Sequence, residues 1–175
     1  MAKKQGIKEY TVEIHVRQAT ANDYDDLCEL YDEIDTLHRV NLPYIFKKSN
    51  GSPREKDYYL GVIADENVGF FVAEVDKKLV GFIHILVRDT PVFPILIHQH
   101  YAVIDGMAIK SEFQNRGLGR ILMEKTQEWA ITKGAEFIEL NVYEFNKNAI
   151  SFYERLGYQT SSRRMRKSLK NDKAG

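Results

Sequence analysis

The chain has 175 residues, which is enough for one domain with a hydrophobic core of its own. Its 25 Lys and Arg residues balance its 25 Asp and Glu residues, so no net charge draws the chain toward nucleic acid or an anionic membrane. The single cysteine, Cys28, excludes an internal disulfide bond, and no apolar run is long enough to span a bilayer, so we expect a cytoplasmic protein.

The first third of the sequence predicts one strand and two helices. Residues 11–17 alternate apolar and polar side chains, as a strand does. Apolar residues then recur at helical spacing, with Thr20 or Asn22 as the expected N-cap. After a loop, Ser52 followed by proline predicts the start of a second helix, which we expect to end near Asp65.

The rest of the sequence predicts a sheet that is covered by helices. Residues 68–75 and 79–88 flank a short polar segment, and this arrangement indicates a hairpin. The further elements are expected at 98–110 (strand), 117–133 (helix), 137–143 (strand), 146–156 (helix) and within 158–169 (one or two strands). Because a strand–helix–strand crossover joins parallel strands, we expect one α/β domain with a mixed sheet and helices on both faces.

A loop with two glycines connects the strand at 98–110 to the helix that follows it. A helix N-terminus exposes unpaired N–H groups with a partial positive charge, and glycine lets a phosphate approach the backbone closely. The loop reads Gln114, Asn115, Arg116, Gly117, Leu118, Gly119, Arg120. We interpret it as a candidate pyrophosphate site. It has no Walker signature and no third glycine of a dinucleotide-binding motif, and a tight turn that merely uses glycine is the alternative.

A second pattern follows one strand later. Asn146, Ala149 and Tyr153 are three and four residues apart, so they share one face of a helix. Asn146 can cap the helix and still offer its amide to a ligand, Ala149 leaves room beside it, and Tyr153 brings a phenol to the same face. Taken singly, each residue also has a structural explanation, as an N-cap, a small residue or a core aromatic.

The two patterns in this order resemble the GNAT superfamily of acyl-CoA-dependent N-acetyltransferases. The motif residues are 114–119 in the loop and 146–153 in the helix, and the resemblance is strongest over about 105–169. It implies that residues 10–170 form the acetyltransferase domain, between flexible termini at 1–9 and 171–175. It also implies a mostly antiparallel sheet in which one parallel pair of strands is splayed at the cofactor site.

The resemblance implies acetyl-CoA as the cosubstrate, and no Cys/His cluster has the spacing of a metal site. The pantetheine arm would lie along Met107, Ala108 and Ile109, and the N–H groups from Asn115 to Arg120 would hold the pyrophosphate. The implied cofactor-binding residues are Met107, Ala108, Ile109, Gln114, Asn115, Arg116, Gly117, Leu118, Gly119, Arg120, Asn146, Ala149 and Tyr153. Independently of the resemblance, Gly106 inside a strand suggests a bulge or a close backbone approach.

For catalysis, the resemblance places Tyr153 at the thioester sulfur, where its hydroxyl can protonate the leaving thiolate as a general acid. The general base is open. Asp105 stands near the expected bulge, where relatives carry an acidic residue, Glu66 is a weaker candidate, and a water chain without any single base is an equal alternative.

The amine acceptor is not fixed by the sequence. His38, Tyr44 and Phe46 fall in the region that forms the acceptor wall of the resembled family, and packing would explain them too. We expect no nucleic acid and no membrane as partners, and the family allows a homodimer through C-terminal strands. A noncatalytic acyl-CoA sensor on the same fold is the alternative function, and a nucleotide-phosphate binder is a weaker one.

Overall fold

The computed structural model describes residues 14–169, so the expected strand residues 11–13 lie outside it. The described chain divides into two compact units, residues 14–141 and residues 142–169. None of the described helices is long and apolar enough to cross a membrane.

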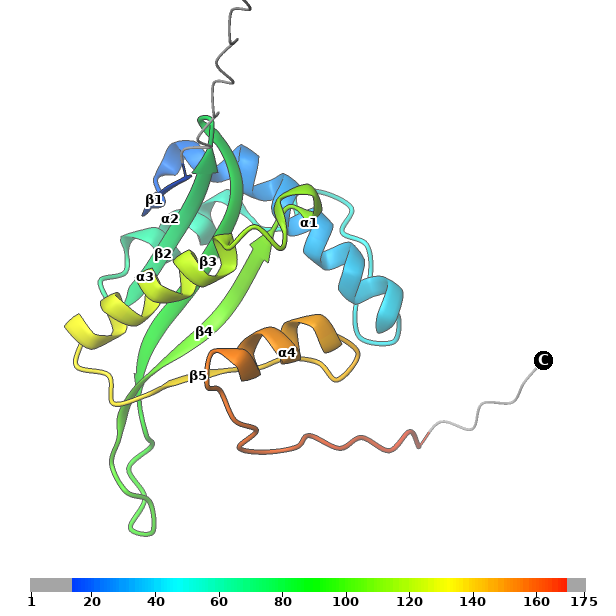
Figure 1. Cartoon of the computed structure of the whole chain (residues 1–175). Coiled ribbons are helices and arrows are strands. Elements are labelled where there is room, and N and C mark those ends of the chain that lie inside the picture. Colours follow the sequence, from blue (N-terminus) through cyan, green and yellow to red (C-terminus); the bar gives the residue numbers. More distant parts are fainter. Residues whose placement is uncertain (1–13, 170–175) are drawn as a thin grey trace, which may run out of the picture. The chain divides into compact units, whose positions relative to one another are not determined.

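The first unit contains a sheet with the strand order β1-β2-β3-β4-β5 (Figure 1). Its strands are β1 (Ile14–Gln18), β2 (Val68–Val75), β3 (Lys78–Asp89), β4 (His100–Ile109) and β5 (Ile138–Leu140). Neighbouring strands are antiparallel except for β4 and β5, which are parallel. The mixed, mostly antiparallel sheet and the parallel crossover pair are therefore confirmed, although β5 is shorter than the expected 137–143.

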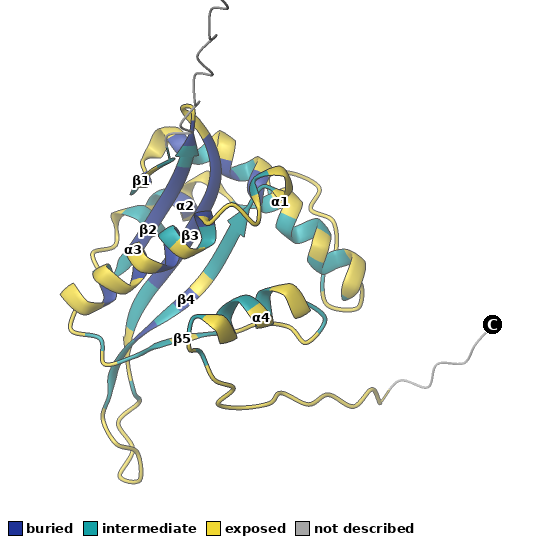
Figure 2. Cartoon of the chain, viewed as in Figure 1, coloured by how far each residue is buried: buried dark blue, intermediate teal, exposed yellow. Residues whose placement is uncertain are grey.

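Helices cover both faces of this sheet. In chain order they are the short 3-10 helix η1 (Ala21–Asp23), α1 (Tyr24–Asn41), α2 (Lys56–Ala64), the short 3-10 helix η2 (Ser111–Phe113) and α3 (Leu118–Thr132). The α3 helix lies across one face, whereas α1 and α2 lie on the other (Figure 1). Successive side chains of a strand point to opposite faces, and helices cover both faces here. The β2 and β3 strands therefore carry apolar side chains on each face, and both are buried over most of their length (Figure 2).

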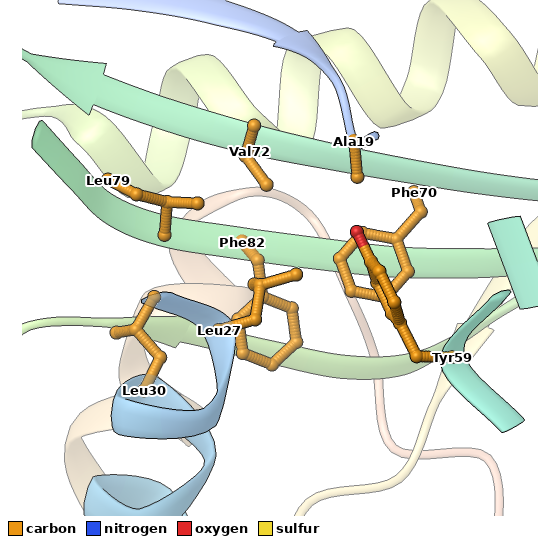
Figure 3. Packing of buried hydrophobic residues seen from close by; sticks show 8 residues of the cluster. All are labelled: Ala19, Leu27, Leu30, Tyr59, Phe70, Val72, Leu79 and Phe82. Atoms are coloured by element: carbon orange, nitrogen blue, oxygen red, sulfur yellow. The ribbon is translucent and has the colours of Figure 1, made fainter. Parts of the chain in front are cut away.

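The main core lies between the sheet and the helices α1 and α2 (Figure 3). Phe70 and Phe82 stack with their ring centroids 5.6 Å apart, and Leu27 and Leu30 of α1 are fully buried in the same cluster. Burying side chains of this size stabilises a fold by about 1.5–3 kcal/mol each. Tyr59 is buried as well, and its hydroxyl donates to the carbonyl oxygen of Thr20 over 2.6 Å, so its polar end is satisfied.

Local chemistry explains the hairpin between β2 and β3. Asp76 and Lys77, the two turn residues, have φ angles of 50° and 64°. Positive φ at both central residues is the geometry that matches the twist of the flanking strands. The predicted hairpin is confirmed.

The second helix begins later than its sequence predicts. We expected Ser52 to cap it, but α2 starts at Lys56 after an extended Glu55. The Ser52 hydroxyl lies 2.8 Å from the Tyr24 hydroxyl, which donates in turn to the carbonyl oxygen of Arg54 over 2.6 Å. These contacts hold the segment before α2 in a non-helical conformation.

The second unit contains α4 (Lys147–Arg155). The side-chain oxygen of Asn146 accepts a hydrogen bond from the backbone N–H of Ala149 over 3.2 Å, so the predicted N-cap is confirmed. The closing strands expected within 158–169 are wrong, because the structure has no helix or strand there. Met165 and Leu169 are 87% and 89% exposed, so the apolar side chains of this stretch are not packed against the described residues.

Candidate functional site

The β4 strand has a free edge at its C-terminal half. Its parallel pairing with β5 ends where Ile104 faces Leu140, and no described strand pairs with that edge from Asp105 to Ile109. On the other edge the register with β3 shifts, because His84 faces Gly106 and Ile85 faces Ile104. Asp105 is therefore the extra residue of a β-bulge, as Gly106 predicted. The sequence also suggested a close backbone approach, which would require glycine here. The structure shows no such requirement, because a Cβ at Gly106 would lie 3.6 Å from Phe82, which is an ordinary contact.

The predicted phosphate loop joins the end of β4 to the start of α3. Gln114 donates from Nε2 to the carbonyl oxygen of Ile109 over 2.9 Å and so ties the loop to the strand. Asn115 and Gly117 have φ angles of 60° and 84°, which turn the chain sharply before the helix. Arg116 lies over the ring of Phe113, 5.5 Å from its centroid. The loop is thus folded as a tight connection with an arginine at its exposed side.

The first turn of α3 has open backbone donors. Its N-cap is Gly117, which has no side chain to cap the helix, and the first amide bonded back to it is that of Ile121, over 3.2 Å. The amides of Leu118, Gly119 and Arg120 have no partner among the described residues. Such a helix end carries a partial positive charge and suits a phosphate group.

Asp105 and His84 come together at the bulge. The Asp105 side chain is 54% exposed, and its Oδ2 lies 3.6 Å from Nδ1 of His84, whose side chain is 10% exposed. Burial lowers the pKa of His84, and the Asp105 carboxylate opposes that shift. Sequence reasoning missed His84, although its place in an apolar run, two residues from Phe82, indicates an inward-facing histidine.

Tyr31 and Arg54 lie on the same side of the sheet as this pair, and the sequence did not single them out. The Tyr31 ring lies 4.9 Å from that of Phe82, and burial raises the pKa of its phenol, with the Asp105 carboxylate adding to the shift. The Arg54 guanidinium lies 4.6 Å from the centroid of the Tyr31 ring and is paired with Asp35 over 2.9 Å. A protonated phenol therefore lies near the bulge, and a fixed ion pair lies next to that phenol.

The expected acceptor residues occupy the C-terminal part of α1 and the loop after it. Nδ1 of His38 lies 2.8 Å from the carbonyl oxygen of Ile34 in the preceding turn, and its ring lies 5.1 Å from that of Phe46. Tyr44 is 64% exposed. Glu66, the weaker base candidate, is exposed in the turn before β2.

The second unit carries the other predicted residues. Ala149 and Tyr153 lie on α4 and Asn146 is its N-cap, at the expected spacing. The Tyr153 ring lies 5.4 Å from that of Phe152 and 5.8 Å from that of Tyr158. Burial raises the pKa of Tyr153, and it raises the pKa of Tyr158 to about 12, so both phenols are protonated at neutral pH.

Comparison with known proteins gives a family match over most of the chain. The model of the acetyltransferase (GNAT) family matches residues 25–158. A protein of Methanocaldococcus jannaschii, named an uncharacterized N-acetyltransferase, is 33% identical over 153 residues. That alignment covers 87% of this chain but 62% of the relative, so the chain spans less than two thirds of that relative's length.

Solved structures resemble the fold over most of the chain. A mutant of protein BH1408 from Bacillus halodurans matches with a TM-score of 0.83 and 25% identity, over 89% of this chain and 99% of that one. The aminoglycoside N-acetyltransferase AAC(6')-Iy, in complex with CoA, matches with a TM-score of 0.67 and 14% identity, over 89% and 99% of the two chains. At that identity the second likeness shows a shared fold.

Proposed function

Because the chain belongs to the acetyltransferase (GNAT) family, we propose that it moves an acetyl group from acetyl-CoA to a primary amine. We further propose that residues 10–170 form the catalytic domain. The observation that carries the proposal is the combination, at one end of β4, of a bulged strand with a free edge and a helix N-terminus with open amides. The first offers backbone groups to an extended arm, and the second offers donors to a diphosphate.

The residues present fit two parts of coenzyme A, the pantetheine arm and the pyrophosphate. In our proposal the pantetheine arm bonds the free edge of Met107, Ala108 and Ile109 as an added strand would. The amides at the start of α3 hold the pyrophosphate, with Arg116 and Arg120 adding side-chain charge. Side-chain charge and helix amides reinforce each other, because both favour an anion at the same point.

The chemistry asks two things of the protein. An amine with a pKa of about 10.4 must lose a proton before it attacks, and we propose the exposed carboxylate of Asp105 as the acceptor of that proton. The oxyanion that forms on attack needs a preorganised donor, and a backbone N–H next to the bulge, near Met107 or Ala108, is our candidate.

Tyr153 completes the proposed machinery as the general acid. Its half-buried phenol keeps its proton at neutral pH, so it has one to give to the departing thiolate. Asn146 and Ala149 share its helix face and would border the same arm. This role requires that α4 bring Tyr153 within hydrogen-bond reach of the thioester sulfur when acetyl-CoA is bound.

For the acceptor we propose a primary amine on a small molecule or a peptide. Several of the solved structures that share the fold are named aminoglycoside acetyltransferases or N-acetyltransferases. His38, Tyr44 and Phe46 are our candidates for contacts to the acceptor.

The decisive experiment measures binding and transfer separately. Isothermal titration calorimetry with CoA should give heat and a single site. Incubation with acetyl-CoA and, in turn, spermidine, kanamycin and a peptide with a free N-terminus should release thiol, with the acetylated amine identified by mass spectrometry. CoA binding without transfer to any amine would favour the acyl-CoA sensor, whereas no binding at all would end the proposal. Competition by ATP tests the nucleotide-binding alternative.

A further inference from the structure

His84 is a buried histidine that the proposed chemistry leaves unused. The residue is 8% exposed and its ring stacks on Phe70, with centroids 5.3 Å apart and an interplanar angle of 18°. Its Nε2 atom is buried and has no hydrogen-bond partner among the described residues. An unpaired buried polar atom is unfavourable, and phenylalanine would fill the same stack without that penalty. Packing alone therefore does not explain a histidine here.

Asp105 gives the histidine a partner. The bulge places Asp105 between the residues that face His84 and Ile85, and its Oδ2 lies 3.6 Å from Nδ1 of His84. Apart from His84, the described part of the chain gives the Asp105 carboxylate no hydrogen bond or ion pair. An exposed carboxylate with no other hydrogen bond or ion pair is free to rotate, so His84 is the group that can fix its direction.

The surroundings of the pair set its charge. The Phe70 ring from β2 stacks on His84, and the phenol of Tyr31 from α1 interacts with the charge of Asp105, whereas Arg54 lies over Tyr31. Burial lowers the pKa of His84, with Asp105 opposing, so the imidazole is neutral at neutral pH. A neutral imidazole beside a carboxylate turns its Nδ1–H toward it, which leaves the Nε2 lone pair as the unpaired atom.

We propose that His84 is a positioning residue, which holds the Asp105 carboxylate at the bulge so that this carboxylate can take the proton of the acceptor amine. The inference rests on the proposed function. In the step, an N–H bond of the ammonium breaks, an O–H bond forms on Asp105, and the proton then leaves to water from the exposed carboxyl group. His84 keeps its own proton throughout. The 3.6 Å separation becomes a hydrogen bond after a shift of roughly 0.6 Å, or through one bridging water.

Two substitutions at His84 test its N–H donor and its stacked ring separately. His84→Asn keeps an N–H donor near the position of Nδ1, whereas His84→Phe keeps the stacked ring and removes the donor. With the fastest of spermidine, kanamycin and the peptide, we expect His84→Phe to lower kcat about 10- to 100-fold. We expect His84→Asn to stay within about threefold of the wild type, and Asp105→Asn combined with His84→Phe to be no slower than Asp105→Asn alone. The Kd for CoA should be unchanged in all of them.

If His84 had only a structural role, His84→Phe would lose turnover only by losing stability. We expect His84→Phe to melt at or above the wild-type temperature, because it removes an unpaired buried atom. A lower kcat in a variant that melts at this temperature is not caused by unfolding. Full turnover of His84→Phe, or additive losses in the double variant, would overturn the positioning role.

A titration tests the pairing of His84 with Asp105 without an activity assay. In NMR spectra of histidine-labelled protein, the His84 signal is identified by its absence from His84→Asn, and its pKa should fall in Asp105→Asn because the carboxylate supports the charged form. An unchanged pKa would overturn the pairing. If the wild type acetylates none of the amines, the proposed function fails and the catalytic role with it, while the titration still decides whether the pair exists.

Discussion

At the scale of single residues, Tyr153 is the sharpest test of the proposed chemistry. Tyr153→Phe removes one hydroxyl and keeps the ring that packs beside Phe152 and Tyr158. General acid catalysis contributes about 10²- to 10⁴-fold, so we expect kcat to fall by at least about 100-fold. The Kd for CoA should change less than about threefold, because the hydroxyl acts on the leaving group rather than on the bound cofactor. Stopped assays of thiol release measure kcat, and calorimetry measures the Kd for CoA.

Tyr158→Phe is the matched control. Its phenol also has a pKa raised by burial, and it stands one ring contact away from Tyr153. We expect kcat within about threefold of the wild type, since the general acid is still in place. Equal losses in the two variants would mean that the aromatic cluster, and not the Tyr153 hydroxyl, matters for turnover.

Asp23 tests the electrostatics of the fold, away from the site. Arg17 donates to both carboxylate oxygens of Asp23, over 2.8 and 2.6 Å, and also to Glu74. The carboxylate is buried, and its hydrogen bonds from Arg17 hold its pKa below the usual range. Asp23→Asn should therefore lower the free energy of unfolding by about 2 kcal/mol at neutral pH.

The effect of Asp23→Asn has a predicted pH dependence. A folded pKa below the unfolded value of about 3.9 gives stability that is present above that value and is lost as the pH falls through the folded pKa. The difference between wild type and variant should thus shrink on acidification below about pH 4. Urea unfolding at a series of pH values measures it, and a difference that stays constant into acid would contradict the pairing.

At the scale of elements, the two ends of α3 provide a controlled test of the phosphate site. Gly117 and Gly134 flank the helix with φ angles of 84° and 78°, and an added Cβ would meet nothing at either position. Alanine at either should cost about 1 kcal/mol of stability, because the left-handed conformation disfavours a side chain. Only Gly117 lies at the proposed diphosphate site, so Gly117→Ala should weaken CoA binding at least about 10-fold, with Gly134→Ala unchanged.

Thermal unfolding and calorimetry on both variants separate strain from binding. Equal stability losses with unequal CoA affinities support a phosphate cradle at the N-terminus of α3. If both variants bind CoA as tightly as the wild type, the glycine at this helix end is a feature of the turn alone.

Elements fixed by local chemistry could be predicted, whereas those fixed by distant partners could not. The Asn146 cap and the turn at Asp76 and Lys77 depend on neighbouring residues, and the sequence predicted both. The closing strands were wrong because a strand needs a pairing partner, which alternation alone does not supply. The late start of α2 depends on the Tyr24 hydroxyl, 30 residues from Arg54 in sequence.

The residues of the candidate site also divide into those fixed by local chemistry, which the sequence predicts, and those fixed by distant partners. The loop at 114–119 follows from glycine and a helix start, so sequence alone locates it. His84 was missed because its significance comes from Asp105 on the neighbouring strand, which the bulge brings opposite. A buried histidine in an apolar run is ambiguous until the strand register is known.

At the scale of the whole molecule, burial is concentrated in the first unit. All of the buried residues among residues 14–169 lie between Ala19 and Ala130, and α4 contains no buried residue. The free energy of unfolding should therefore depend mainly on the sheet and on α1, α2 and α3. Substitutions on α4, such as Tyr153→Phe, should leave the melting temperature nearly unchanged, which makes their kinetic effects interpretable.

The balance of charge makes a further prediction about the whole chain. Because 25 Lys and Arg residues offset 25 Asp and Glu residues, long-range attraction cannot account for binding of an anionic cofactor. Any salt dependence must come from local charge, which in our proposal is Arg116, Arg120 and the start of α3. We expect the Kd for CoA to rise several-fold between about 0.05 and 0.5 M KCl, as screening shortens the range of exposed charges.

Substitution of the arginines locates the source of that dependence. The double variant Arg116→Gln with Arg120→Gln should bind CoA more weakly at low salt and lose most of the salt dependence, because the screened charges are gone. The matched control replaces Arg163 and Arg164, two exposed arginines in the segment without regular structure, and should keep the wild-type salt dependence. Calorimetric titrations at matched salt concentrations make the comparison. If the control variant loses the salt dependence instead, the diphosphate is held by the C-terminal segment and not by the helix that begins at Leu118.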